Sequence, residues 1–229
     1  MTVIGHFVYN GSMIKTIAPQ VYERHVIPEG LDWTLRHHLI LTHEANVFID
    51  AGLGLRGMTE LAQYADPSKP HWLIYTHHHF DHVLGAAALP FTRIIAASPF
   101  NERLTDDYAI SLATYKEFQE GPPSCVPAET LINQVTPMGE LILIPAPGHS
   151  SDGLMIHVPR LGLLFTGDNL PDQGKGPLPE LEDPVAYRLT LEAMIHTKAH
   201  TLIGAHDEPQ PLSEVDIALK ALNLRGTIG

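Results

Sequence analysis

The sequence predicts an α/β fold of the α+β type, in which two β-sheets pack face to face and helices cover their outer sides. Two observations favour this architecture. Apolar runs of strand length gather in each half of the chain, and stretches with helical spacing separate and follow them. Clusters of histidine or aspartate also come directly after apolar strands. Because 229 residues with 44% hydrophobic content can bury a full core, we expect one domain spanning residues 1–229.

The first half of the chain begins with strands and then alternates between strands and helices. Gly11, Pro19 and the stretch Pro28-Glu29-Gly30 separate the first apolar runs, which favours an antiparallel meander. After Gly52 the apolar residues recur at helical spacing. The expected strands are residues 7–10, 14–17, 21–27, 35–42, 47–50, 72–76 and 93–97, and the expected helices are residues 55–64, 82–89 and much of 99–120.

The second half returns to strands after Gly121-Pro122-Pro123, which ends the preceding helix. Neither a fixed-period repeat nor a low-complexity linker interrupts it. The two groups of strands would then form the two mixed sheets of the sandwich. The expected strands are residues 131–135, 140–145, 154–158, 163–166 and 201–204, and the expected helices are residues 184–197 and 212–222.

The most informative stretch is Thr76-His77-His78-His79-Phe80-Asp81-His82, which follows the apolar residues 72–75. Neutral imidazole nitrogens and carboxylate oxygens suit zinc, iron or manganese. On a turn that leaves a strand, His77 and His79 share one side and His78 turns away. If a helix begins at Asp81, the side chains of Asp81 and His82 point at a second position. The stretch therefore offers ligands to two metal ions.

Three later residues stand in a similar context, each after an apolar strand and a glycine. His149 follows Gly148, Asp168 follows Gly167, and His206 comes two residues after a glycine. Glycine lets the backbone turn tightly while the edge of the sheet presents the next side chain. We expect these side chains to complete a metal site at one edge of the sheets.

The amino-acid composition limits the classes of molecule that the protein is expected to bind. The chain has 14 Lys and Arg against 26 Asp and Glu, a net charge of −12, and lacks the basic footprint of a nucleic-acid binder. No apolar stretch reaches the roughly 18 residues of a membrane span. The first residues do not resemble a signal peptide, and Cys125, as the one cysteine, cannot form an intrachain disulfide. We expect a cytoplasmic protein with a small-molecule substrate and neither nucleic-acid nor membrane partners.

With these residues in place, the chain resembles the metallo-β-lactamase superfamily over about residues 39–209. The motif of that family is His-x-His-x-Asp-His followed by a later His, Asp and His. The resemblance implies an αββα sandwich with the site at one edge of the sheets. It also implies that His77, His79 and His149 bind one metal ion, that Asp81, His82 and His206 bind a second, and that Asp168 bridges the two.

Within the superfamily, the chain looks like a glyoxalase II-like hydrolase of small thioesters, esters or lactones. Class B β-lactamases generally lack the bridging carboxylate found here as Asp168, so the resemblance disfavours antibiotic hydrolysis. Two departures also matter. Glyoxalase II carries a C-terminal helical domain with glutathione-binding residues, for which the sequence after His206 is too short. The lactonases usually place a tyrosine where this chain has Pro171. Neither of these named substrates is carried over to this chain.

The ligand set implies a hydrolytic mechanism. Two divalent ions about 3.5 to 4 Å apart can hold a bridging water and lower its pKa towards about 7, so a metal-bridging hydroxide would attack the carbonyl carbon. One metal would stabilise the oxyanion that forms. Asp81 is the catalytic candidate, because it lies beside that water and could orient it or carry a proton to the leaving group. We expect two divalent ions, zinc first, with iron or manganese as alternatives.

Other functions stay open at this point. A mononuclear iron persulfide dioxygenase of the same superfamily would hold its iron with His77, His149 and Asp168. Hydrolysis of a small phosphodiester uses the same two-metal chemistry. A metal-binding module without turnover is a further alternative, against which the intact ligand set argues. A homodimer is expected from its general frequency among proteins alone.

Several residues have both a functional and a plain structural interpretation. Cys125 reads as an inert loop thiol, because the sequence places no electropositive group beside it. Most of the remaining histidines read as surface or core residues. The exceptions would be His37, His38 and His43, if their strand ends near the site. Residues that could orient the ligands are Thr76, Ser150 and Thr166, and residues that could line the pocket are Tyr115, Phe118 and the loop 171–179 with Lys175.

Overall fold

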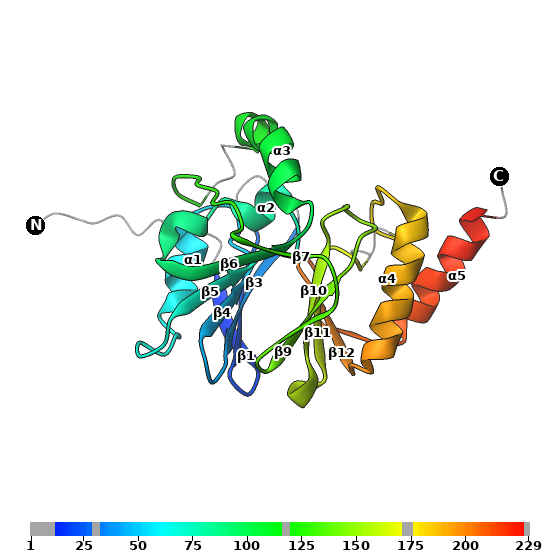
Figure 1. Ribbon diagram of the computed structural model, residues 1–229, viewed down its shortest axis with the longest axis horizontal. Helices are drawn as coiled ribbons and strands as arrows, with labels where there is room; N and C mark the ends of the chain where they lie inside the picture. Colours follow the sequence, from blue (N-terminus) through cyan, green and yellow to red (C-terminus); the bar gives the residue numbers. More distant parts are fainter. Residues whose placement is uncertain (1–11, 29–32, 116–119, 171–175, 227–229) are drawn as a thin grey trace, which may run out of the picture.

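The computed structural model describes residues 12–28, 33–115, 120–170 and 176–226, which form two sheets packed face to face (Figure 1). The first sheet has seven strands in the order β1-β2-β3-β4-β5-β6-β7. Neighbouring strands are antiparallel from β1 to β4 and parallel from β4 to β7. The strands are β1 (Met13–Ala18), β2 (Val21–Val26), β3 (Leu35–Leu41), β4 (Asn46–Ile49), β5 (His71–Ile74), β6 (Phe91–Ala97) and β7 (Thr130–Ile132).

The second sheet has six strands in the order β13-β12-β11-β10-β9-β8. Its neighbouring strands are antiparallel except for the parallel pair β11 and β12. Both sheets are therefore mixed, as the sequence predicts. The strands are β8 (Thr136–Met138), β9 (Leu141–Pro145), β10 (Leu154–Val158), β11 (Leu163–Gly167), β12 (Thr201–Gly204) and β13 (Gln210–Pro211).

Helices lie outside the two sheets and give four layers (Figure 1). Helices α1 (Leu55–Ala62), α2 (Phe80–Val83) and α3 (Phe100–Tyr115) lie on the side of the first sheet. Helices α4 (Pro184–Thr197) and α5 (Glu214–Gly226) cover the second sheet. The expected sandwich of two mixed sheets flanked by helices is confirmed.

The central parallel strands are apolar at successive positions because both of their faces are buried. In β4, Val47 and Ile49 belong to the core between the sheets, whereas Phe48 packs with the helices outside. In β5, Ile74 faces the other sheet and Leu73 faces outward. Period-2 alternation thus places each strand between two cores, one between the sheets and one under the helices.

One edge of the sandwich collects the ends of strands from both sheets. Parallel strands β4 and β5 end there, and so do the parallel strands β11 and β12 of the second sheet. Two backbone hydrogen bonds join the sheets at this edge. The amide of Leu154 donates to the carbonyl oxygen of Thr76 (2.7 Å), and the amide of Arg36 donates to that of Ala205 (2.8 Å). Residues that follow these strands are consequently brought together.

The helix expected over residues 82–89 is wrong, because α2 ends at Val83 and only a 3₁₀ turn (Ala86–Ala88) follows. Gly85 explains the break. A Cβ atom there would lie 2.2 Å from the carbonyl oxygen of Ala51, so the preceding loop packs directly on the Gly85 backbone. The amide of Leu84 also donates to the carbonyl oxygen of Gly52 (2.7 Å) instead of continuing a helix.

Other boundaries differ as well. The strand expected over residues 131–135 ends at Ile132 as β7, and a separate short strand, β8, begins at Thr136 after the chain has crossed from the first sheet to the second. Strand β13 was not expected, because two residues carry no periodic signal. Helix α3 covers Phe100–Tyr115, in agreement with the helix expected over much of residues 99–120. The strand expected over residues 7–10 lies outside the described residues.

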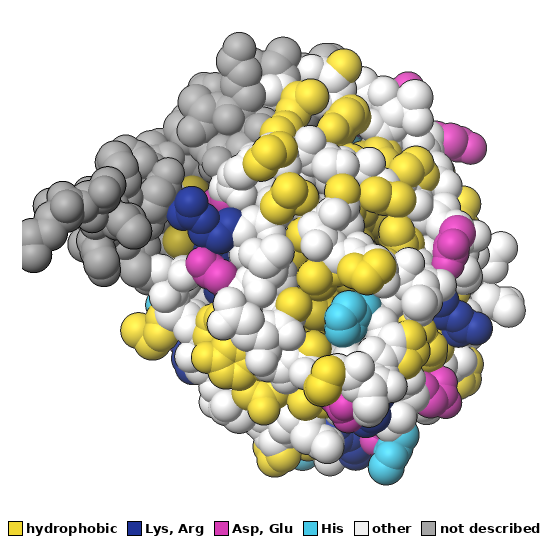
Figure 2. All heavy atoms as spheres, turned by 90° about the vertical axis from the view of Figure 1, so that its left-hand side faces the viewer, with side chains coloured by type: hydrophobic (Ala, Val, Ile, Leu, Met, Phe, Trp, Pro, Cys, Tyr) yellow, Lys and Arg dark blue, Asp and Glu magenta, His cyan; other side chains and the backbone are white. Residues whose placement is uncertain are grey.

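Figure 2 shows the side of the molecule that carries α1. Apolar side chains are spread over this face, and the Lys and Arg side chains of its described residues are scattered rather than gathered into a basic patch. Among the described residues, no helix is both long and apolar enough to cross a bilayer.

Candidate metal centre

The histidine-rich turn leaves β5 and leads directly into α2. His79 is the N-cap residue of α2, and Asp81 and His82 lie in its single turn. A helix that begins next to Asp81 was the condition for two ligand positions, and the structure meets it. His77, Asp81 and His82 are all buried, with 5% or less of each residue exposed.

The structure brings the seven candidate residues together as two groups that share Asp168. The first group joins the turn after β5 to the loops after β9 and β11. His79 Nδ1 lies 2.9 Å from His77 Nε2 and 3.1 Å from His149 Nε2. Asp168 Oδ2 lies 3.7 Å from Nε2 of both His77 and His149. Three imidazole nitrogens and one carboxylate oxygen therefore converge on one point.

The second group lies on the other side of Asp168. Oδ1 of Asp168 lies 3.4 Å from His82 Nε2, and Oδ2 of Asp168 lies 3.1 Å from His206 Nε2. Asp81 Oδ2 completes the group, 3.6 Å from His82 Nε2 and 3.5 Å from His206 Nε2. Two nitrogens and two carboxylates converge here, which is a harder ligand set than that of the first group.

Hydrogen bonds on the outer ring nitrogens fix how two of these histidines face the centre. Nδ1 of His149 donates to the carbonyl oxygen of Glu180 (2.8 Å), and Nδ1 of His206 donates to that of Thr34 (2.9 Å). A carbonyl oxygen only accepts, so each Nδ1 carries the proton. The Nε2 atoms that face the centre are then free to coordinate through a lone pair.

The inward atoms of the second group suit a cation. His82 Nε2 and Asp168 Oδ1 are buried without a hydrogen-bond partner among the described residues, and they lie 3.4 Å apart. Leaving such atoms unpaired costs on the order of 1–3 kcal/mol each. A divalent ion coordinated by both would satisfy them, so the donor set and its orientation fit a metal site.

The electrostatics of the two groups differ. Burial, together with the neighbouring rings, lowers the pKa of His77 well below its ordinary value and that of His79 to about 4, so both are neutral donors. Burial also acts to lower the pKa of His82 and His206. Nearby carboxylates, with Asp168 acting on both rings, outweigh it and raise the pKa of His206 to about 9 and that of His82 well above normal. The second position therefore stabilises positive charge.

Asp50, which the sequence analysis did not single out, supports the second group. Its Oδ2 accepts from His82 Nδ1 (2.8 Å) and from Thr76 Oγ1 (2.8 Å), and its Oδ1 accepts from the Thr76 amide (2.7 Å). The hint in the sequence was an acidic residue at the end of apolar β4, two residues before Gly52. Asp50 itself has a positive φ of 59°, which Asp tolerates better than most residues.

Of the three hydroxyl residues expected to orient ligands, only Thr76 does so in the described structure. Its Oγ1 lies 3.1 Å from His77 Nδ1 and 3.3 Å from His82 Nδ1. Thr166 Oγ1 bonds to the carbonyl oxygen of Ile203 (3.2 Å), and Ser150 Oγ has no hydrogen-bond partner among the described residues. Flanking a ligand in sequence does not place a hydroxyl beside its ring.

His78 turns away from both groups, as expected, and contacts two carboxylates. Its Nδ1 lies 2.8 Å from Asp152 Oδ1 in the loop after β9, and its Nε2 lies 2.9 Å from Asp107 Oδ2 on α3. It therefore ties the histidine turn to α3. These partners could not be read from the sequence, because they lie 74 and 29 positions from His78.

The remaining candidates have structural positions. The thiol of Cys125 is partly buried, and burial raises its pKa to about 12, so it is an inert thiol as expected. His37 and His38 lie on β3, outside both groups, and His43 follows the far end of that strand, away from the site. The side chains of Tyr115, Phe118 and Lys175 lie outside the described residues.

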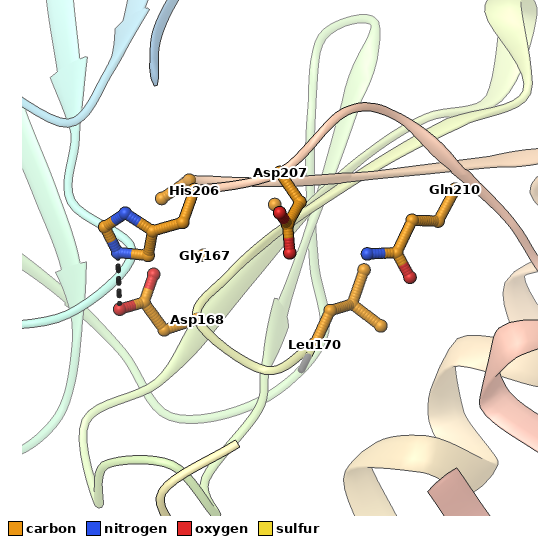
Figure 3. Close-up of a pocket in the computed structure, with 8 residues that line it drawn as sticks. Gly167, Asp168, Leu170, His206, Asp207 and Gln210 are labelled. Atoms are coloured by element: carbon orange, nitrogen blue, oxygen red, sulfur yellow. Dashed lines mark hydrogen bonds and ion pairs between the residues drawn. The ribbon is translucent and has the colours of Figure 1, made fainter. Parts of the chain in front are cut away.

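A small cavity adjoins the second group. Figure 3 shows the contact between His206 and Asp168, with Asp207, Gln210 and Leu170 on the other side of the cavity. Leu170 lies in the loop after β11, Asp207 in the loop after β12 and Gln210 at the start of β13, so the strand ends that carry the ligands also shape this space.

The family model described as the metallo-beta-lactamase superfamily matches residues 38–206. None of the curated proteins matches the sequence. Solved structures do match in fold. The metallo-beta-lactamase FIM-1 from Pseudomonas aeruginosa, in its mono-zinc form, has a TM-score of 0.76 at 17% identity, covering 95% of this chain and 97% of that one.

Two further structures are similar. A metallo beta lactamase from Erythrobacter litoralis, with beta mercaptoethanol in its active site, has a TM-score of 0.73 at 19% identity and covers 92% of this chain and 96% of its own. A metallo beta lactamase from Hirschia baltica has a TM-score of 0.73 at 16% identity, with 92% and 97% covered. At these identities the likeness establishes the fold and leaves the reaction to be argued from the site.

Proposed function

The chain belongs to the metallo-β-lactamase superfamily, and from that premise we propose that it is a dinuclear metal-dependent hydrolase of a small thioester, ester or lactone. The observation that carries the proposal is the position of Asp168, whose carboxylate belongs to both ligand groups. A carboxylate shared in this way can hold two cations close together. His77, His79 and His149 would hold the first ion, and Asp81, His82 and His206 the second.

Two divalent ions, with zinc as the first choice for imidazole and carboxylate ligands, would supply a water of lowered pKa and a Lewis acid for the substrate carbonyl. The residues of the chain do the rest. His149 and His206 keep their protons on the outer nitrogen, through the carbonyl oxygens of Glu180 and Thr34, and so present lone pairs inward. Asp50 holds His82 in the same way. The site is thereby preorganised before substrate arrives.

Asp81 is the residue that we assign to proton handling. Its Oδ2 lies 3.5 Å from His206 Nε2 and 3.6 Å from His82 Nε2, so it faces the second position. A carboxylate there can orient the nucleophile and pass its proton to the leaving group. Because a coordinated carboxylate is a weak base, thioesters and lactones, whose leaving groups need less protonation than an amide nitrogen, fit this arrangement best.

The substrate class rests on Asp168 and on charge. A bridging aspartate is the feature by which the chain resembles the glyoxalase II-like hydrolases rather than the class B β-lactamases. A net charge of −12 disfavours polyanionic substrates. The face in Figure 2 likewise gathers no basic patch from its described residues. A small acyl compound is therefore favoured over a nucleic acid.

Elemental analysis of the purified protein tests the proposal, with Asp168→Ala alongside. We expect about two zinc ions per chain, loss of metal in the variant, and turnover by the metal-loaded protein within a panel of thioesters, esters and lactones. A metal-loaded protein that cleaves no member of the panel would contradict the proposal. About one iron per chain would favour sulfur oxidation by a single-metal site instead, with oxygen uptake as the assay.

A further inference from the structure

Hydrogen bonds connect the start of β3 to the segment that carries His206. The carbonyl oxygen of Thr34 accepts from His206 Nδ1 (2.9 Å), and the amide of Arg36 donates to the carbonyl oxygen of Ala205 (2.8 Å). These bonds run between the two sheets, because β3 belongs to the first and the segment after β12 belongs to the second. The position of His206 is therefore set partly by residues of the opposite sheet.

The Arg36 side chain adds a third connection. Its Nη2 lies 2.6 Å from Glu208 Oε1, two residues after His206, and its Nη1 lies 2.5 Å from Glu23 Oε1 on β2. The planar guanidinium thus spans two carboxylates, which a single ammonium group could not do with the same geometry. Arg36 is 5% exposed and Glu23 is fully buried, so solvent screens the Arg36–Glu23 contact weakly.

Other groups hold Glu23 and Glu208 in place. Lys15 Nζ on β1 lies 3.2 Å from both Glu23 Oε1 and Glu208 Oε2, and His38 Nε2 lies 3.3 Å from Glu23 Oε2. The network therefore reaches from β1, β2 and β3 of the first sheet to the His206 segment of the second. One end of the network lies in the first sheet, and the other end lies beside the candidate ligand His206.

Both groups take ligands from both sheets, and a different backbone bond joins the sheets beside each group. Asp81 and His82 come from the first sheet, whereas His206 comes from the second, so the distances among them depend on how the sheets sit at this edge. On the side of the first group, the bond from the Leu154 amide to the Thr76 carbonyl oxygen joins the sheets independently of Arg36. Loss of Arg36 should therefore affect the two groups unequally.

We infer that Arg36 is a positioning residue for His206, and that with Glu23 and Glu208 it sets the affinity of the second metal position. The inference rests on the proposed function, since it assumes that this group binds a metal ion. Arg36 contacts neither Asp168 nor the other candidate ligands in the described structure, and it acts through the backbone and the carboxylate on either side of His206.

A matched control lies on the neighbouring strand. Arg24 is also buried, at 1% exposed, and also spans two glutamates, with Nε 2.6 Å from Glu60 Oε2 and Nη2 2.9 Å from Glu120 Oε1. Glu60 belongs to α1, Glu120 accepts from the amide of Arg56 at the start of α1, and neither glutamate contacts His206 in the described part of the chain. Arg24→Met therefore removes an equivalent buried ion pair network without touching the proposed connection.

The experiment compares the wild type, Arg36→Met, Arg24→Met and Glu208→Gln by calorimetric zinc titration. We expect Arg36→Met to weaken the second zinc site by about 10- to 100-fold, the usual range for residues that support a ligand, and to leave the first within about threefold. Arg24→Met should lower the Tm but should not change the zinc affinity of one site relative to the other. Glu208→Gln, whose side chain is 59% exposed and need not threaten folding, should weaken the second site by a smaller factor.

Hydrogen exchange of the metal-free proteins supplies a readout that does not depend on metal binding. In Arg36→Met the amide of residue 36, bonded to the Ala205 carbonyl oxygen, should exchange faster than in Arg24→Met. Equal weakening of both zinc sites, or an unchanged second site with unchanged exchange, would overturn the inference while leaving the dinuclear proposal intact. A wild type that binds no zinc would instead overturn the proposed function, and this inference with it.

Discussion

His82 Nδ1 lies 2.8 Å from Asp50 Oδ2, and this contact turns the other ring nitrogen of His82 towards Asp168. The pair consists of residues 32 positions apart, one at the end of β4 and the other in α2. A carboxylate behind a coordinating histidine fixes the ring orientation and makes the ring a better donor. The orientation of His82 in the second ligand group therefore depends on a residue that does not face the centre of that group.

Asp50→Asn tests this dependence. The amide keeps the size of the carboxylate and tolerates the positive φ at this position, but it lacks the charge. We expect zinc affinity at the second position to fall by about 10- to 100-fold. Competition with a chromogenic chelator measures it, and Asp66→Asn, in an exposed turn where Asp66 bonds to Ser68, serves as the control. Equal affinities in the two variants would show that Asp50 has no such role.

His149 and His206 belong to different groups, so single substitutions should separate the two metal positions. We expect His149→Ala and His206→Ala each to reduce the metal content from about two ions per chain to about one, because three ligands of the other group remain besides the shared Asp168. Native mass spectrometry counts the ions directly. A loss of both ions in His149→Ala and in His206→Ala would mean that the two positions fill as a unit.

The stability of the protein should fall in acid partly through Glu23. Burial alone would raise the pKa of this carboxyl, but His38, Arg36 and Lys15 outweigh it and lower the pKa to about 2. The folded state thus binds the Glu23 proton more weakly than the unfolded chain, so the stabilisation is complete above about pH 4.5 and is lost as the pH falls towards 2. It amounts to on the order of 3 kcal/mol.

Urea unfolding of the metal-free protein between pH 2 and pH 6 measures this effect, with Glu23→Gln as the comparison. The variant should be less stable at pH 6 and should lose less stability between pH 4.5 and pH 2 than the wild type. Parallel curves for the two proteins over that interval would show that Glu23 does not titrate as inferred.

A side chain at Gly85, at the break after α2, should overpack the fold. A Cβ atom at this position would lie 2.2 Å from the Ala51 carbonyl oxygen and 2.4 Å from that of Gly54, and backbone atoms cannot rotate away. We expect Gly85→Ala to destabilise the fold by about 1–3 kcal/mol, as overpacking usually does. Thermal unfolding measures it.

Gly204→Ala is the control for Gly85→Ala. The nearest atom to a Cβ at Gly204 is the Gly167 carbonyl oxygen at 3.5 Å, an ordinary contact, so its Tm should stay close to that of the wild type. A Gly85→Ala variant as stable as Gly204→Ala would mean that the loop over residues 51–54 gives way easily.

The periodicity of apolar residues predicted many of the strands and helices correctly. Strands β2, β3, β9, β10 and β11 lie close to their expected bounds, because alternating or continuous apolar runs bounded by Gly and Pro are local signals. Helix α4 begins after Asp183, whose side chain accepts from the amides of Val185 and Ala186, and this start was also visible in the sequence. The boundaries that failed, at Gly85 and between β7 and β8, are those that contacts with distant residues decide.

The same division applies to the candidate site. The sequence by itself determined which side chains could hold metal, because their chemical types and the glycines before them are local features. Only the tertiary structure decided that Asp168 is shared by two groups, that the Thr34 and Glu180 carbonyl oxygens orient His206 and His149, and that Asp50 stands behind His82. The contacts of Glu180, Asp50 and Thr34 with these histidines join residues that lie between 31 and 172 positions apart. No local pattern encodes them, because they depend on how segments far apart in the sequence pack together at one edge of the sandwich.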